Sequence, residues 1–193
     1  DTFDPARRAP RWMTFLTAAL SLGVLALTRP LSAVAVGLPF AFHGLYLLWK
    51  GTATDRKIAL GIGGLALLVG SSLFLWQYHV TGDPLTNPYV LWWPYDTIGF
   101  GEHVGRQVGG YCPKDAIPNM QVSLFFGNYD LFGWPGFSWL FMPFGLLALL
   151  RRPRALMAAG VAPSIVLAYT LYWIGSWLIG PRYYYEGLLG AVL

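Results

Sequence analysis

The chain has 193 residues, of which 55% are apolar and only 11% charged. A soluble domain carries about 25% charged residues, so this composition excludes an ordinary soluble fold. The net charge of +4 is too small and too dispersed to indicate nucleic-acid binding. The single Cys112 excludes an internal disulfide and a metal site built from cysteines. We therefore predict an all-α membrane protein, a multi-pass helical bundle with about five to six transmembrane helices and a long structured outer loop.

Apolar runs that cross about 30 Å of hydrocarbon, or nearly so, are expected in five places. They are residues 12–28, 32–49, 57–77, 136–150 and 155–178. In the third run, "GIGGLALLVG" supplies small residues for close helix packing. Residues 1–77 are thus predicted to hold three transmembrane helices, 78–135 an extracytoplasmic loop, and 136–193 two helices and the start of another. Because the sequence begins at Asp1 and ends inside a short apolar run, we expect it to be a segment of a longer protein.

Lysine and arginine predict the orientation, because cytoplasmic connections of membrane proteins are enriched in both. Nine of the thirteen lie in one alternating set of connections and four in the other. The nine are Arg7, Arg8, Arg11, Lys50, Arg56, Lys57, Arg151, Arg152 and Arg154. The turn at Arg29, the loop 78–135 and the segment "IGPRYYYE" (179–186) are then extracytoplasmic, in a protein of the cytoplasmic membrane.

The long loop is rich in Pro, Gly and aromatic residues, which favours ordered turns over a flexible linker. Asp83 and Asn87 are expected to form turns by bonding to local backbone. Residues 118–134 are predicted to form a short amphipathic helix on the outer membrane surface. Asp96 lies between "WWPY" and "TIGFG", where aromatic rings can stack on a sugar, although a purely structural role stays open. Glu102 and His103 match no known metal-ligand spacing, so no metal site is predicted.

The outward-facing arginines are candidates for binding an anion. Arg182 follows Pro181, which suits the first position of a new helix, where free backbone N–H groups favour a phosphate. Its guanidinium and the hydroxyls of Tyr183, Tyr184 and Tyr185 add donors. The alternative is an aromatic belt at the membrane interface in which Arg182 pairs with the glutamate four residues later. Arg29, at an outer turn, has the same two interpretations.

Several stretches in order resemble one family: "TRPLSAVAVGLPF", "YHVTGDPLTNPYVLWWPYDTIGFG", "LFGWP" and "IGPRYYYE". Together they are similar to bacterial membrane glycosyltransferases of the GT-C superfamily, the dolichyl-phosphate-mannose–protein mannosyltransferase-like (family 39) proteins. The resemblance covers residues 25–193 and corresponds to the C-terminal half of such proteins. It implies that a many-helix bundle transfers a sugar from a polyprenyl-phosphate carrier to an acceptor on the outer face of the membrane. Arg29, Arg182 and Tyr183–Tyr185 would contact the carrier phosphate, while Asp96 and His103 would lie on the acceptor side.

The sequence departs from this family in one respect. The catalytic acidic residue of these hexosyltransferases lies in the first outer loop of the full protein, and no counterpart is found here. The segment alone is therefore not expected to be catalytic, and no catalytic residue is assigned. No cofactor is predicted, although a divalent metal in the full-length enzyme stays open.

The alternative function is a non-catalytic multi-pass subunit packed in a larger membrane complex, such as a respiratory or photosynthetic assembly. The expected partners are the lipid bilayer and a polyprenyl-phosphate-linked sugar, or other membrane subunits under this alternative. An ion-coupled transporter is disfavoured, because the predicted spans contain no acidic residue.

Overall fold

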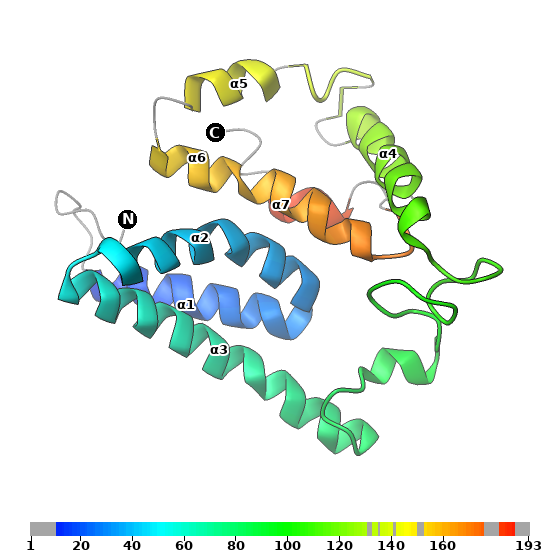
Figure 1. The fold of residues 1–193 in the computed structure, drawn as a ribbon, viewed down its shortest axis with the longest axis horizontal. Helices are drawn as coiled ribbons and strands as arrows, with labels where there is room; N and C mark the ends of the chain where they lie inside the picture. Colours follow the sequence, from blue (N-terminus) through cyan, green and yellow to red (C-terminus); the bar gives the residue numbers. More distant parts are fainter. Residues whose placement is uncertain are drawn as a thin grey trace. The chain divides into compact units, whose positions relative to one another are not determined.

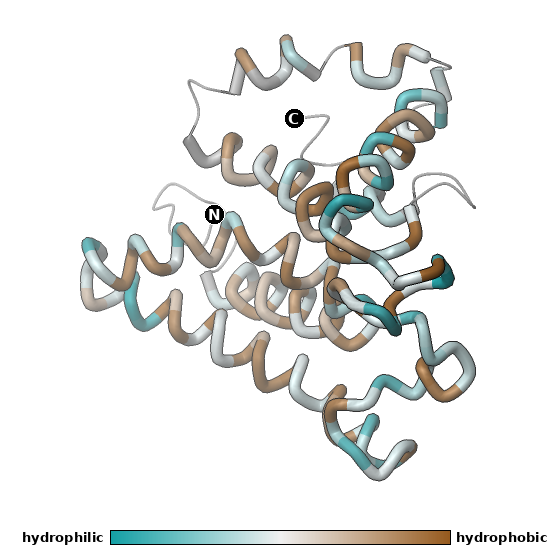
Figure 2. The backbone as a smooth tube through the Cα atoms, turned by 45° about the vertical axis from the view of Figure 1, so that its right-hand side comes forward, coloured by the Kyte–Doolittle hydropathy of each residue, from teal (hydrophilic) through white to brown (hydrophobic). Residues whose placement is uncertain are grey.

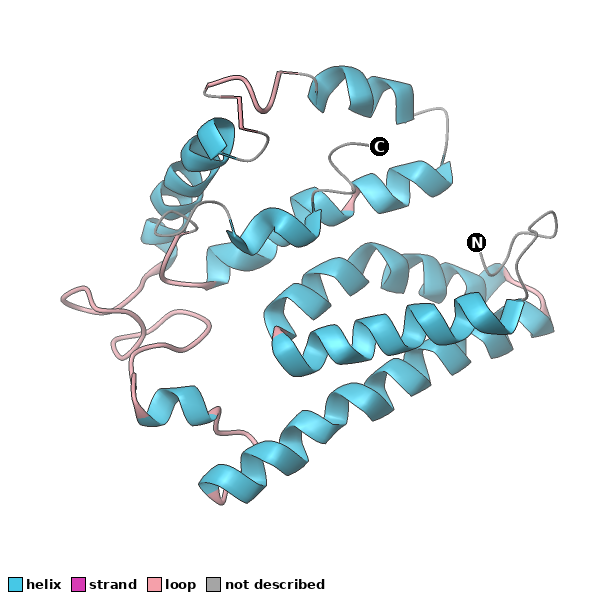
Figure 3. Ribbon diagram, turned by 180° about the vertical axis from the view of Figure 1, so that it is seen from behind, coloured by secondary structure: helices cyan, strands magenta, loops and turns pink. Residues whose placement is uncertain are grey.

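A computed structural model of the chain describes residues 11–130, 133–134, 136–140, 142–149, 153–175 and 182–187. Within these ranges most residues are helical and no strand forms, which confirms the helical class (Figure 3). The multi-pass membrane architecture stays a prediction. The chain divides into two units, Asp1–Leu85 and Thr86–Leu193, each with its own internal packing.

The described part of the first unit consists of α1 (Arg11–Thr28), α2 (Pro30–Lys50) and α3 (Ala53–Thr81) (Figure 1). Pro30 occupies the first turn of α2, where its fixed φ suits a helix start. A capping box begins α3: Asp55 N donates to Thr52 Oγ1 at 3.2 Å, and Thr52 N donates to Asp55 Oδ2 at 3.0 Å. The helix ends at Gly82, whose φ of 79° is the left-handed conformation that glycine adopts without strain. Local sequence signals therefore account for the helix boundaries in this unit.

Glycines allow α1 and α3 to pack closely. A Cβ atom on Gly23 of α1 would lie 2.7 Å from Val69 Cβ, and one on Gly61 of α3 would lie 2.7 Å from Phe15 Cε2. Real Cβ atoms do not approach neighbours so closely, so any larger residue would separate the helices. Gly61 belongs to "GIGGLALLVG", and the packing role predicted for that run is confirmed at this position.

Two helices, α2 and α3, are long and apolar enough to cross a membrane. They cover the predicted spans 32–49 and 57–77, and α3 continues to Thr81, beyond the predicted boundary at residue 77. Leucines on α3 point outward, with Leu67 75%, Leu68 69% and Leu75 73% exposed. Figure 2 shows hydrophobic residues along these helices and hydrophilic ones at the α2–α3 turn and in the loop after α3.

The second unit contains more and shorter helices. They are η1 (Pro88–Leu91), α4 (Pro113–Asp130), α5 (Met142–Leu149), α6 (Pro153–Ala159), α7 (Val161–Ala168), η2 (Tyr169–Leu171) and η3 (Arg182–Gly187). Asn87 begins η1 by accepting a hydrogen bond from Tyr89 N at 3.0 Å, and Asp83 Oδ1 accepts one from Leu85 N at 3.1 Å. The turn-forming roles predicted for Asn87 and Asp83 are thereby confirmed.

The helix predicted over residues 118–134 begins earlier, at Pro113, and ends at Asp130. The early start has a local cause. Cys112 N donates to Asp115 Oδ2 at 2.9 Å, and this bond caps the first turn of the helix. Pro118 lies within this helix without ending it. The location of α4 on a membrane surface stays a prediction.

The two predicted spans nearest the C-terminus, 136–150 and 155–178, differ most from the described helices. Within 136–150 the described helix is α5, whose eight residues extend about 12 Å at 1.5 Å per residue. Within 155–178 the helical part ends at Leu171, and Tyr172 is extended, with φ −111° and ψ 126°. The reason is tertiary: Gly99 N donates to Leu171 O at 2.8 Å, and Asn119 Nδ2 donates to Tyr172 O at 2.9 Å. Groups from distant segments thus bond to carbonyls that a continuing helix would use itself.

Candidate functional site

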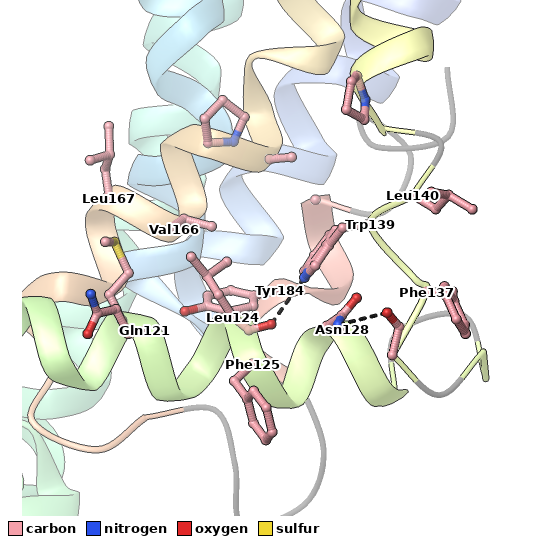
Figure 4. A pocket seen from close by; sticks show the side chains of 16 residues that line it. Gln121, Leu124, Phe125, Asn128, Phe137, Trp139, Leu140, Val166, Leu167 and Tyr184 are labelled. Atoms are coloured by element: carbon pink, nitrogen blue, oxygen red, sulfur yellow. Dashed lines mark hydrogen bonds between the residues drawn. The ribbon is translucent and has the colours of Figure 1, made fainter.

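An apolar groove of about 1090 Å³ lies in the second unit, between α4, α7, η3 and the turn at residues 136–140 (Figure 4). Its lining comprises Met120, Gln121, Leu124, Phe125, Asn128, Gly136, Phe137, Trp139, Leu140, Pro143, Ala162, Pro163, Val166, Leu167, Tyr184 and Gly187. Among these residues none is a Lys, Arg, Asp, Glu or His. A volume at the upper end of the usual range for ligand pockets, walled mainly by carbon, suits a long apolar molecule.

Hydrogen bonds hold the turn at 136–140 against α4, so this wall of the groove is preformed. Trp139 Nε1 donates to Leu124 O at 3.1 Å, and Asn128 Nδ2 donates to Gly136 O at 3.0 Å. Gly127 makes room for the indole, because a Cβ there would lie 2.8 Å from Trp139 Cζ2. Contacts within the protein therefore fix this wall of the groove.

Tyrosines connect η3 to the end of α7. The rings of Tyr183 and Tyr169 stack with centroids 4.8 Å apart, and Tyr183 meets Tyr172 edge-on at 5.7 Å. The next residue, Tyr184, is buried, lines the groove and is hydrogen-bonded to Ser123 of α4. Adjacent residues of η3 thus face two environments, the apolar groove and a polar aromatic cluster.

Asp96 is the acidic member of that cluster. Its Oδ1 accepts two hydrogen bonds, from Tyr172 Oη at 2.7 Å and from Trp173 Nε1 at 2.7 Å. The pKa of Tyr172 is raised well above the ordinary value, first because burial removes its phenol from water and then because it is hydrogen-bonded to Asp96 and Tyr183. Tyr172 therefore stays a neutral donor, and the carboxylate is held in one orientation.

The loop carrying Asp96 is anchored at several further points. Tyr111 is 1% exposed and donates from its hydroxyl to Thr170 O at 2.9 Å. Burial raises its pKa, and the nearby carboxylate of Asp115 acts in the same direction. Arg106 lies over the Tyr95 ring at 4.7 Å, and its guanidinium also donates to the Tyr95 hydroxyl. This ordering confirms that the predicted loop is not a flexible linker.

The structure brings together some of the predicted site residues. Tyr183 and Asp96 both contact Tyr172, and Tyr184 is on the groove wall. His103 is exposed in the loop and does not line the groove.

Of the two predicted arginines, the structure describes the side chain of only one. Arg29 belongs to the first unit, where it is exposed between α1 and α2, with backbone bonds to both helices. Arg182 begins η3, but its side chain and that of Tyr185 lie outside the described part of the structure. Because η3 is a 3₁₀ helix of six residues, the helix-dipole argument for a phosphate at Arg182 loses its basis.

Tyr172 and Trp173 donate to Asp96, and Tyr111 anchors the loop that carries it. The sequence analysis predicted none of these three residues. Tyr172 and Trp173 lie in a run that was predicted as a transmembrane helix, so composition hid their role. Asp96 itself was singled out by its aromatic flanks.

Comparisons with known proteins add no identification: the chain matches no protein-family model, no curated protein and no solved structure. Within the described ranges, His, Cys, Asp and Glu side chains form no group of three or more that could hold a metal ion.

Proposed function

We propose that this chain is the carrier-binding part of an integral-membrane glycosyltransferase that transfers a sugar from a polyprenyl-phosphate carrier on the outer face of the membrane. The observation that carries the proposal is the apolar groove, which has the size and lining to hold a long hydrocarbon chain. The resemblance of four sequence segments to GT-C enzymes supports the same ligand.

The position of η3 supports a lipid with a charged head. Tyr184 lines the groove, and Arg182 precedes it by two residues, so a fixed positive charge belongs to the same short segment. A guanidinium binds phosphate through parallel hydrogen bonds and stays charged at any physiological pH. The carrier's isoprenoid chain would occupy the groove, and its phosphate would lie near Arg182.

A membrane location is supported by α2 and α3, which have the length and composition of spanning helices. Basic residues at the α2–α3 turn support a cytoplasmic position for that turn. The other ends of these helices, with Arg29 and the start of the long loop, are then outside. Under this proposed topology the loop and its Asp96 are on the outer face, where the proposed reaction takes place.

The groove is tested by photo-crosslinking the full-length protein in nanodiscs with a photoactivatable polyprenyl phosphate. Val166→Trp fills the groove and is expected to reduce labelling at least about tenfold. Leu67→Trp is the matched control, because it adds the same ring to the exposed side of α3. Equal labelling of both variants would rule out the groove as the carrier site.

The arginines are tested separately by sugar transfer. Arg182→Ala and Arg29→Ala are expected to reduce turnover with little loss of protein level. Wild-type turnover in both variants would refute a role of these arginines in sugar transfer. Absence of labelling in the wild type, together with stoichiometric co-purification with a larger membrane complex, would favour the non-catalytic subunit instead.

A further inference from the structure

A polar cluster lies next to the groove, and a single short segment joins the two. Tyr184 lines the groove, its neighbour Tyr183 contacts Tyr172, and Tyr172 donates to Asp96. Asp96 is thus linked to the groove wall through Tyr172 and η3, so an amphiphile with its tail in the groove is the kind of ligand that would carry a polar group toward Asp96.

The two carboxylate oxygens of Asp96 differ in what they do. Oδ1 accepts the bonds from Tyr172 and Trp173, whereas Oδ2 accepts none from the described residues. Asp96 is only partly buried, so Oδ2 is not sealed from solvent. The first oxygen thus fixes the carboxylate, and the second is available to a ligand.

Charge decides which part of a carrier can occupy this position. A carboxylate repels a phosphate, but it accepts strong hydrogen bonds from neutral hydroxyl groups. Trp173, which donates to Oδ1, packs edge-on against Tyr95 with ring centroids 5.7 Å apart, and Arg106 lies over the Tyr95 ring at 4.7 Å, so the carboxylate has aromatic surroundings of the kind that contact sugar rings. The polar group that fits Asp96 is therefore hydroxylated and uncharged.

We propose that Asp96 binds hydroxyl groups of the sugar carried by the polyprenyl phosphate, which makes it a specificity residue for the donor. This inference rests on the proposed function. It assigns Asp96 to the donor side, whereas the family resemblance implies the acceptor side. Asp96 discriminates a loaded carrier from an empty one, because the empty carrier has no hydroxyls for Oδ2.

The test compares binding of undecaprenyl phosphate with that of its mannosyl, glucosyl and galactosyl esters to the full-length protein in nanodiscs. Wild type is expected to bind one of the esters about tenfold more tightly than the bare phosphate, the value of one hydrogen bond to a charged group. Asp96→Asn keeps the shape and an oxygen for Tyr172 and Trp173, and is expected to abolish that preference.

Two further variants separate binding from folding. Asp115→Asn is the matched control: it removes an equal charge from the same unit, at the α4 cap, and should leave the preference intact. If Asp96→Asn does not fold, Trp173→Phe serves instead, since it keeps the carboxylate charge, loses one of its two donors, and should weaken the preference about threefold.

The outcomes distinguish the two proposals. If wild type does not bind bare undecaprenyl phosphate, the proposed carrier function fails. If it binds the bare lipid but no ester more tightly, or if the folded Asp96→Asn variant keeps the preference, the assignment of Asp96 is overturned. In a sugar-transfer assay, an effect of Asp96→Asn on the KM for the acceptor alone would place Asp96 on the acceptor side. That result would also overturn the assignment of Asp96 to the donor.

Discussion

Replacing Gly127 by alanine tests whether the groove wall is as tightly packed as the geometry indicates. The new Cβ would lie 2.8 Å from Trp139 Cζ2, so the ring must withdraw by roughly 0.6 Å to reach the nearest ordinary contact distance. The indole is tethered by its bond to Leu124 O at 3.1 Å, and withdrawal stretches that bond.

The expected magnitude follows from three contributions. Overpacking costs about 1–3 kcal/mol, and weakening the indole hydrogen bond costs up to about 1 kcal/mol. Alanine in a helix interior gains back about 1 kcal/mol over glycine. We therefore expect Gly127→Ala to destabilise the fold by about 0–3 kcal/mol in total, and to be about 1 kcal/mol or more less stable than a Gly→Ala change that meets no neighbour.

Gly145→Ala on α5 is the matched control, because a Cβ there meets nothing within 4 Å and only the helix-propensity gain applies. Thermal unfolding followed by circular dichroism in detergent compares the two variants, and carrier photo-crosslinking reports whether Trp139 has left the groove wall. A Gly127→Ala protein as stable as the Gly145→Ala protein would refute the packing described for Trp139.

Three other results are expected. Gly23→Val should lower the melting temperature and the yield of the protein, because its branched side chain has no room against Val69; an unchanged melting temperature would contradict the α1–α3 packing. The raised pKa of Tyr172 means that the folded state keeps this phenol protonated, so its contribution to stability is present below pH about 10 and is lost as the pH rises further. Melting curves should show a smaller alkaline loss for Tyr172→Phe than for wild type, and parallel curves would count against its burial. In a Cys-free background, a membrane-impermeant maleimide should label Val108→Cys from outside intact cells and Thr54→Cys only after lysis, whereas the reverse pattern would invert the proposed topology.

Much of the first unit follows from local sequence. The capping box at Thr52, the proline at the start of α2 and the glycine after α3 determine where those helices begin and end, because each satisfies or terminates the backbone within a few residues. The loop turns at Asp83 and Asn87 are of the same kind. Such features depend on neighbours in the chain, and the sequence displays those directly.

The candidate site depends on contacts between distant segments. Asp96 and Tyr172 are 76 residues apart, and their hydrogen bond exists only because the helix ending at Leu171 gives way to an extended segment that pairs with Ile98. Hydropathy predicted a continuing helix there, since Tyr and Trp suit both a span and an interface. Long-range hydrogen bonds to these backbone groups outweigh that preference.

The sequence alone predicted the helical class and the two helices that have the length and composition to cross a membrane. It also predicted Asp96 as a candidate site residue. Only the tertiary structure decided that Tyr183 lies against the partner of Asp96 while Tyr184 lines an apolar groove. The physical reason is that composition and periodicity record which residues prefer lipid or water. They carry no information about which polar group, tens of residues away, will satisfy a given donor or carboxylate.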